Sequence, residues 1–198
     1  MAEHRTVPAG RGLAWITDAF AVLRRGHGTY LGACLFAGLL ASMPLIGLLP
    51  SAAMPVLQAG LLSLLRTCAG GGRGRAGQLF DGFTQPGAFV RLLPIALFNL
   101  GFVLALFAVL GIAAGPELDA LAREAQAGGK PDPGHVLAVF RRMVPPALAM
   151  MPLAAFVNWM LMLAIPRAML DGVPGGVALR EAAGAVWANL GAFVANLF

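Results

Sequence analysis

Residues 92–116 read LLPIALFNLGFVLALFAVLGIAAGP, and they contain no Asp, Glu, Lys or Arg. Two further uncharged stretches, residues 26–65 and 143–166, are 40 and 24 residues long. Since roughly 20 apolar residues of helix cross a bilayer core about 30 Å thick, each stretch is long enough for at least one span. Residues 182–198 are also uncharged, and these 17 residues make most of one span. The four stretches predict an integral membrane protein.

The composition agrees with this class. The 198 residues are 59% hydrophobic and 12% charged, whereas soluble domains average about 25% charged residues. This length predicts a single membrane domain, residues 1–198. The net charge of +5 does not predict nucleic-acid binding, because the basic residues lie at the ends of the spans and no aromatic binding module accompanies them.

We predict an all-α, polytopic membrane protein with four full spans and a partial fifth one. Pro50 cannot continue a helix, so a tight turn at Leu49–Ser51 is expected to separate the first two spans. The partial span, 182–198, has no closing basic residue, and we expect the natural chain to continue past Phe198. The four full spans are predicted at residues 29–49, 52–66, 92–114 and 144–165.

The lead, residues 1–28, contains an amphipathic pattern from Gly12 to Arg25 with Trp15 on its apolar face. Such a helix lies in the membrane interface or packs on the cytoplasmic face of the protein itself. Gly28 and Gly32 then form a G-x-x-x-G motif, which allows close approach of helix backbones in lipid. We therefore expect Gly32 at a contact between helices.

The basic residues predict the orientation. When the segments alternate across the membrane, ten Arg residues fall on one side, and three Arg residues with Lys130 fall on the other. The positive-inside rule then places the N-terminus in the cytoplasm of a bacterial cell and the 115–142 loop in the periplasm. The predicted location is the bacterial inner membrane.

A glycine-rich segment, residues 69–77, follows the second predicted span. It lacks the G-K-[ST] ending of a phosphate-binding P-loop, and no strand precedes it. We interpret it as a flexible basic loop at the membrane surface. Arg73 and Arg75 in this segment, with the nearby Asp81, are candidates for a surface that binds lipid headgroups or a partner.

Three strongly polar residues lie within the predicted spans: Gln58, Asn99 and Asn158. Amides at this depth form hydrogen bonds between helices, or they line the path of a transported substrate. Both interpretations stay open from the sequence.

No group of residues carries catalytic chemistry. His4, His27 and His135 are scattered, and the predicted topology places His135 on the opposite side from the other two. The predicted spans contain no Asp, and therefore no pair for an intramembrane aspartyl protease. We expect no enzyme activity, no cofactor and no metal site.

Three segments carry a resemblance to a known family. They are Pro8-Ala9-Gly10-Arg11-Gly12, Pro55-Val56-Leu57-Gln58-Ala59-Gly60-Leu61 and Gln78-Leu79-Phe80-Asp81-Gly82-Phe83. With the Trp15 helix, they resemble a family of proteobacterial multi-pass inner-membrane proteins that is known only as a domain of unknown function. The resemblance implies location and topology, and it implies no activity or site residues.

The expected function is that of a non-enzymatic membrane protein. It would act through membrane lipids, through other membrane proteins or by self-association, and envelope homeostasis is one such role. The alternative is a small transporter or channel subunit that uses Gln58, Asn99 and Asn158.

Overall fold

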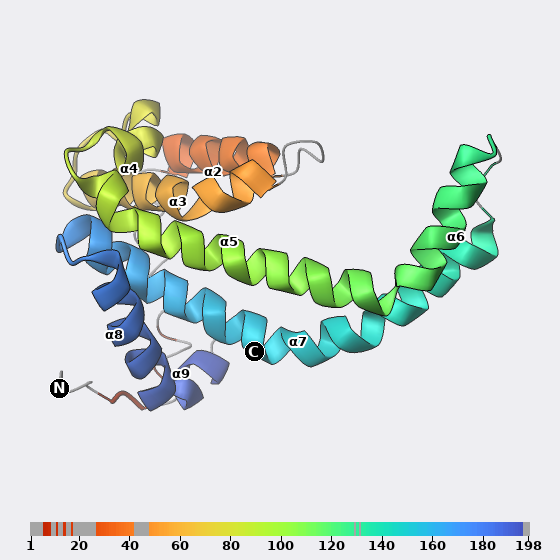
Figure 1. Ribbon diagram of the computed structural model, residues 1–198. Coiled ribbons are helices and arrows are strands. Elements are labelled where there is room, and N and C mark those ends of the chain that lie inside the picture. Colours follow the sequence, from red (N-terminus) through yellow and green to blue (C-terminus); the bar gives the residue numbers. More distant parts are fainter. Residues whose placement is uncertain are drawn as a thin grey trace. The chain divides into compact units, whose positions relative to one another are not determined.

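The computed structural model describes residues 6–8, 11, 14, 17, 27–41, 48–128, 130 and 132–195. Every regular element in this part of the chain is helical (Figure 1). In chain order the elements are α2 (His27–Ala41), α3 (Leu48–Ala69), the 3-10 helix η1 (Ala76–Phe80), α4 (Asp81–Thr84), α5 (Ala88–Ala113), α6 (Gly115–Gln126), α7 (Pro133–Leu170), α8 (Gly175–Ala188) and α9 (Leu190–Ala195).

The chain divides into two compact units. The first contains residues 1–100 and 157–198, and the second contains residues 101–156. Helices α5 and α7 each contribute to both units, because the boundaries after residues 100 and 156 fall within them. Each unit is described by itself.

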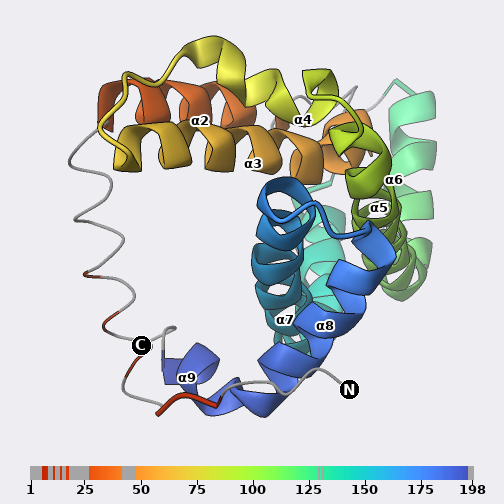
Figure 2. The same ribbon diagram turned by 90° about the vertical axis from the view of Figure 1, so that its left-hand side faces the viewer.

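In the first unit, α2 lies alongside α3, and η1 and α4 pack on α3 (Figures 1 and 2). A compact apolar cluster joins these elements. It consists of the buried residues Ala33, Leu57, Leu64, Cys68 and Leu79. Leu79 is central to the packing of η1, since it is 3% exposed in a 3-10 helix whose neighbouring residues are largely exposed. The hydrophobic burial of Leu79 holds η1 against α3.

Two glycines allow α3 to meet η1 and α4 at backbone distance. A Cβ on Gly60 would overlap the carbonyl oxygen of Leu79, and a Cβ on Gly82 would overlap the carbonyl oxygen of Val56. No side chain fits at either place. Two of the three segments that carry the family resemblance, 55–61 and 78–83, therefore pack directly against each other.

The beginning of α5 contacts the end of α7 and the beginning of α8. The Arg91 Nε donates a hydrogen bond to the Ala168 carbonyl oxygen at 3.1 Å, and a Cβ on Gly175 would overlap the Arg91 carbonyl oxygen. Earlier in α7, the ring of Trp159 lies 5.4 Å from that of Phe193, which brings α9 onto α7. These contacts use side chains and backbone from four helices.

In the second unit, local signals set the ends of the helices. Pro116 lies in the first turn of α6, where its missing N–H is not needed. Gly128, at φ +71°, follows the end of α6. Asp132 then caps α7, because its Oδ1 accepts a hydrogen bond from the Gly134 N–H at 2.8 Å.

Two polar contacts join α6 to the beginning of α7. The Arg142 Nε lies 3.1 Å from the Glu117 Oε1, and Glu124 Oε1 lies 2.5 Å from the His135 Nδ1. The Asp132 N–H also donates to Glu124 Oε2 at 2.9 Å. The hydrogen bonds from the Asp132 N–H and from the His135 ring hold the pKa of Glu124 below its ordinary value, because they favour the charged carboxylate.

Two helices in the described part of the chain are long and apolar enough to cross a membrane, α5 and α7. They correspond to the predicted spans 92–114 and 144–165. The prediction of four full spans is not confirmed: α2 has 15 residues, and the apolar part of α3 extends only from Ala53 to Ala69.

Three boundaries differ from the predicted ones. Pro50 lies inside the first turn of α3, where its missing N–H costs little, so the predicted turn at residues 49–51 is wrong. The sequence pattern predicts a separate short helix from His135 to Arg142 before the last full span, but these residues are continuous with that span in α7. Most of the predicted amphipathic helix, Gly12–Arg25, lies outside the described residues; Arg11, Ala14 and Thr17 are helical.

The C-terminal segment is not one continuous helix. Helix α8 ends before Asn189, and α9 begins after it. The Asn189 side chain accepts a hydrogen bond from the Val7 N–H at 2.7 Å and donates one to the Ala185 carbonyl oxygen at 3.0 Å. Asn favours such interruptions because its side chain competes for backbone hydrogen bonds. The predicted partial span, 182–198, is therefore broken, and its last three residues lie outside the described residues.

Candidate functional site

The glycine-rich segment after α3 begins as an ordered helix cap. Gly71 has φ +80°, its N–H donates to the Cys68 carbonyl oxygen at 3.1 Å, and the Gly72 N–H donates to the Thr67 carbonyl oxygen at 3.0 Å. This pair of hydrogen bonds is the Schellman arrangement, which requires a left-handed residue after the helix. The glycines thus end α3, and the expected flexible loop has a defined start.

The second half of this segment is tied back to α3. Gln78 accepts a hydrogen bond from the Arg75 N–H at 2.9 Å, and its Nε2 donates to the Thr67 Oγ1 at 2.8 Å. A Cβ on Gly74 would lie 2.9 Å from the buried Cys68 Sγ, so the backbone at Gly74 also packs on α3. Both anchors fix the path of residues 70–75, which we call the arginine loop.

Three exposed cations lie on or next to the arginine loop: Arg66, Arg73 and Arg75. Within the described residues, none of the three forms an ion pair. Asp81 is the acidic residue nearest in sequence, and neutral donors occupy it: the Ser63 hydroxyl donates to Oδ2, and so does the Gln85 Nε2 at 3.0 Å. The sequence predicted Arg73, Arg75 and Asp81 as one surface, but Asp81 has a structural role and the two arginines remain open to a ligand.

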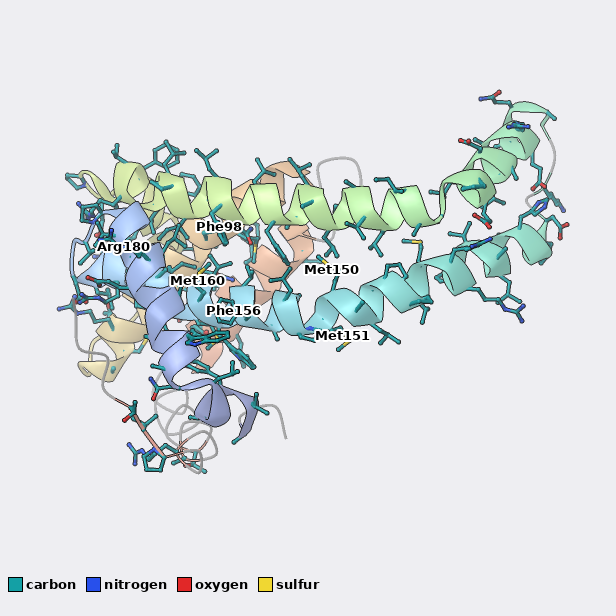
Figure 3. All side chains as sticks on the ribbon, turned by 60° about the horizontal axis from the view of Figure 1, so that its bottom comes forward. Phe98, Met150, Met151, Phe156, Met160 and Arg180 are labelled. Atoms are coloured by element: carbon teal, nitrogen blue, oxygen red, sulfur yellow. The ribbon has the colours of Figure 1, made fainter. Side chains whose placement is uncertain are left out.

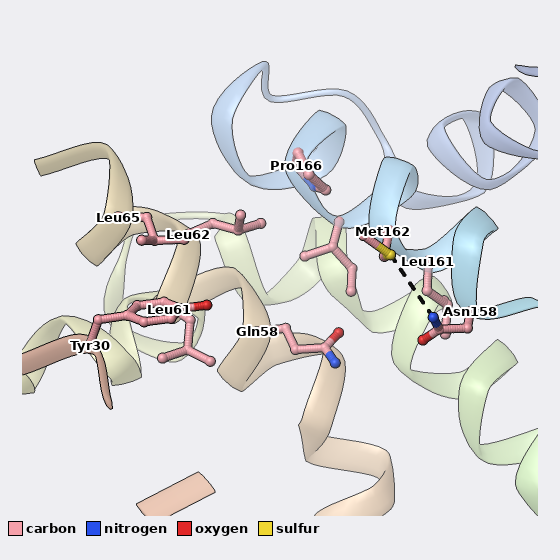
Figure 4. A pocket seen from close by; sticks show the side chains of 10 residues that line it. Tyr30, Gln58, Leu61, Leu62, Leu65, Asn158, Leu161, Met162 and Pro166 are labelled. Carbon is pink, nitrogen blue, oxygen red and sulfur yellow. Dashed lines mark hydrogen bonds between the residues drawn. The ribbon is translucent and has the colours of Figure 1, made fainter. Parts of the chain in front are cut away.

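The predicted polar residues of the spans are brought together only in part. A pocket of about 190 Å³, which we call the amide pocket, is lined by Tyr30 from α2, by Gln58 and leucines of α3, and by Asn158 with apolar residues of α7. Figure 4 shows the Gln58 and Asn158 amides extending into this space from opposite helices. The Asn158 Nδ2 lies 3.9 Å from the Met162 sulfur. Asn99 is not among the lining residues.

A larger hollow of about 450 Å³ lies between α2 and η1, and we call it the α2–η1 groove. The sequence did not predict it. Its lining residues are Thr29, Gly32, Ala33 and Phe36 from α2, and Ala76, Gly77, Leu79 and Phe80 from η1. The only hint in the sequence was Gly32 of the G-x-x-x-G motif, and that motif also fits helix packing.

Gly32 lines this groove and does not support a helix contact. No described atom lies within 4 Å of a Cβ built on Gly32, so the expected close approach of a second helix at this glycine is not seen among the described residues. Ala33 and Ala37, at 6% and 3% exposure, are the small residues by which α2 packs. The buried small residues of α2, Ala33 and Ala37, therefore start one residue after Gly32, the last residue of the G-x-x-x-G motif.

The described residues contain no group of three or more His, Cys, Asp or Glu side chains close enough to hold a metal ion. Comparison with protein-family models, with curated proteins and with solved structures finds no match to this chain. The family resemblance seen in the sequence therefore stays a prediction.

Proposed function

We propose that this chain is an integral protein of the bacterial inner membrane that binds anionic lipid headgroups through the arginine loop. The observation that carries the proposal is that Arg66, Arg73 and Arg75 are exposed and form no ion pair with any described residue, while neutral donors engage Asp81. Arginine matches the geometry of phosphate oxygens and binds them through two parallel hydrogen bonds.

Helices α5 and α7 support the membrane location. Between Arg91 and Glu117, and again between Arg142 and Arg167, no charged residue occurs. Each run exceeds the roughly 20 residues that cross a bilayer core. Side chains along both helices are almost all carbon and sulfur between their charged ends, Met150 and Met151 among them (Figure 3). Several large apolar residues of these runs are exposed, which suits contact with lipid: Leu104, Phe107, Ile112, Leu148 and Met151.

The orientation follows from the same two helices. If α5 and α7 are the spans, residues before Leu92 and after Pro166 share one side, and the 115–142 loop lies on the other. The basic residues still divide ten to four, so the positive-inside rule favours a cytoplasmic N-terminus and a cytoplasmic arginine loop. The cytoplasmic leaflet carries anionic lipid, and each basic residue near it contributes about 1 kcal/mol of attraction.

The test is the lipid dependence of thermal stability. In neutral detergent, added phosphatidylglycerol should raise the melting temperature of the full chain more than phosphatidylcholine does, because a ligand of the folded state stabilises it. The double variant Arg73→Gln, Arg75→Gln should lose this difference, and so should high salt. Arg123→Gln, an exposed arginine of α6, is the matched control. Equal effects of the two lipids on the wild-type protein would refute the proposal.

One observation favours a second candidate function, the passage or binding of a small neutral solute. Gln58 and Asn158 line the same apolar pocket, and Gln58 forms no hydrogen bond with another described side chain or backbone group. Both residues are exposed, so their amide donors and acceptors are accessible to a solute or to water.

A further inference from the structure

The α2–η1 groove combines an apolar lining with an adjacent positive charge. Seven of its eight lining residues are glycine, alanine, leucine or phenylalanine, and Thr29 adds one hydroxyl group. The Phe36 and Phe80 rings meet edge to face with their centroids 6.5 Å apart, which joins the two walls. At about 450 Å³ the groove lies within the range of small-molecule sites, roughly 300–1,000 Å³.

The arginine loop leads directly into one wall of this groove. Arg75 is bonded to Ala76, the first lining residue of η1, and Arg73 lies two residues before it. Both arginines are exposed, and neither is neutralised by an acidic side chain within the described part of the chain. The groove therefore offers hydrocarbon contact next to two free cations.

A ligand that matches both properties has an anionic head and a hydrocarbon chain. We infer that the α2–η1 groove holds an acyl chain of an anionic phospholipid whose phosphate is bound by Arg73 and Arg75. This inference rests on the proposed function and deepens it, because it identifies the ligand as a whole lipid held at a defined place. Charge complementarity favours the lipid over an apolar segment of protein, which would leave both arginines without a partner.

The glycines of the groove provide a direct way to fill it. No described atom lies within 4 Å of a Cβ built on Gly32 or on Gly77, which come from opposite walls. Both glycines line the groove, so a larger side chain at either position adds bulk to its wall, and its Cβ overlaps no described atom. Gly28 is the matched control: it lies one turn before Gly32 on α2, is exposed, has equally free space, and does not line the groove.

The experiment measures retention of phosphatidylglycerol by the full chain. Wild-type protein and variants are stripped of lipid in neutral detergent, exposed to phosphatidylglycerol and examined by native mass spectrometry. Gly32→Leu and Gly77→Leu should each lower the apparent affinity about tenfold, since the leucine takes the place of several methylene groups of the lipid. Gly28→Leu should retain lipid as the wild type does. Glycerol phosphate, which has no acyl chain, should bind at least about tenfold more weakly than the lipid.

The outcomes separate this inference from the proposed function. If Gly32→Leu and Gly77→Leu retain lipid like Gly28→Leu, while Arg73→Gln, Arg75→Gln loses it, the groove is not the acyl site and headgroup binding stands. If the arginine variant also retains lipid, both are wrong. Equal binding of glycerol phosphate would likewise exclude an acyl-chain site.

A change of oligomeric state in Gly32→Leu with unchanged lipid retention would identify the groove as a contact between copies. Circular dichroism of each variant verifies that it is folded. Because Gly32→Leu and Gly77→Leu lie on opposite walls, the test can still be made if one of the two variants does not fold.

Discussion

Ser63 of α3 donates a hydrogen bond from its hydroxyl to the carboxylate of Asp81, the first residue of α4. Asp81 is half-buried, and Gln85 donates to the same oxygen. The carboxylate thus joins α4 to α3 through neutral partners. Asp81 forms no ion pair with Arg73 or Arg75, so both arginines are available for an anionic ligand.

Loss of the Ser63 hydroxyl should destabilise the packing of α4 on α3. Ser63→Ala removes a hydrogen bond to a charged acceptor, and we expect it to lower the free energy of unfolding by about 1.5–3 kcal/mol. Thr84→Ala, which removes an exposed hydroxyl bonded to the Phe80 carbonyl oxygen, should change it by less than about 1 kcal/mol. Thermal melting in detergent compares the two, and equal effects would contradict the structural role of Ser63.

The close approach at Gly60 predicts strong sensitivity to one methyl group. Gly60→Ala places a Cβ against the Leu79 carbonyl oxygen, so α3 and η1 must separate. We expect a loss of about 1–3 kcal/mol, as for overpacked sites. Gly28→Ala meets no described atom and should leave the protein unchanged or stabilise it by up to about 1 kcal/mol. A Gly60→Ala protein as stable as Gly28→Ala would show that this backbone contact is absent.

The lowered pKa of Glu124 predicts how the junction of α6 and α7 responds to acid. A carboxylate whose folded pKa is depressed contributes stability above its unfolded pKa, and this contribution is lost as the pH falls through the lower folded pKa. Wild-type protein should therefore melt at a higher temperature than Glu124→Gln at neutral pH. The difference should shrink below about pH 4.

The control for this titration is Asp119→Asn, a change of an exposed acid on the same helix. Its melting temperature relative to the wild type should not follow the same pH dependence. A difference between wild type and Glu124→Gln that stays constant from neutral pH to about pH 3 would contradict the hydrogen bonds from Asp132 and His135.

The amide pocket predicts a functional effect of Gln58 without a stability effect. Since Gln58 forms no hydrogen bond with another described group, Gln58→Leu should not lower the melting temperature. If the pocket admits a neutral solute, wild-type proteoliposomes should take up glycerol faster than empty ones, and Gln58→Leu should remove the increase. A destabilised Gln58→Leu protein with unaltered uptake would instead support a hydrogen bond between helices, worth about 0.6 kcal/mol.

The ten-to-four division of basic residues predicts the topology. Alkaline phosphatase, which is active in the periplasm, should be active when fused after Lys130 and inactive when fused after Arg75. High activity at Arg75 with none at Lys130 would reverse the orientation and would place the arginine loop away from the anionic cytoplasmic leaflet.

Local features of the sequence determined the helices of the second unit and the two long apolar helices. The uncharged run that begins at Leu92 is helical as far as Ala113, because in an apolar run of this length a helix satisfies its backbone groups internally. Pro116, Gly128 and Asp132 set the ends of α6 and the start of α7 through their own backbone preferences. These signals act within a few residues, so the sequence shows them directly.

The roles of the glycines were decided only by the tertiary structure. Gly32 and Gly60 both lie in apolar helices with small neighbours, yet a Cβ on Gly60 meets the Leu79 carbonyl oxygen, whereas a Cβ on Gly32 has no described atom within 4 Å. The same holds for Asp81, whose partner is Ser63 rather than a nearby arginine. A glycine or a carboxylate is compatible with many different neighbours. Which neighbour it contacts is decided only when the burial of residues such as Leu79 brings distant segments together. That packing leaves the α2–η1 groove open beside the arginine loop.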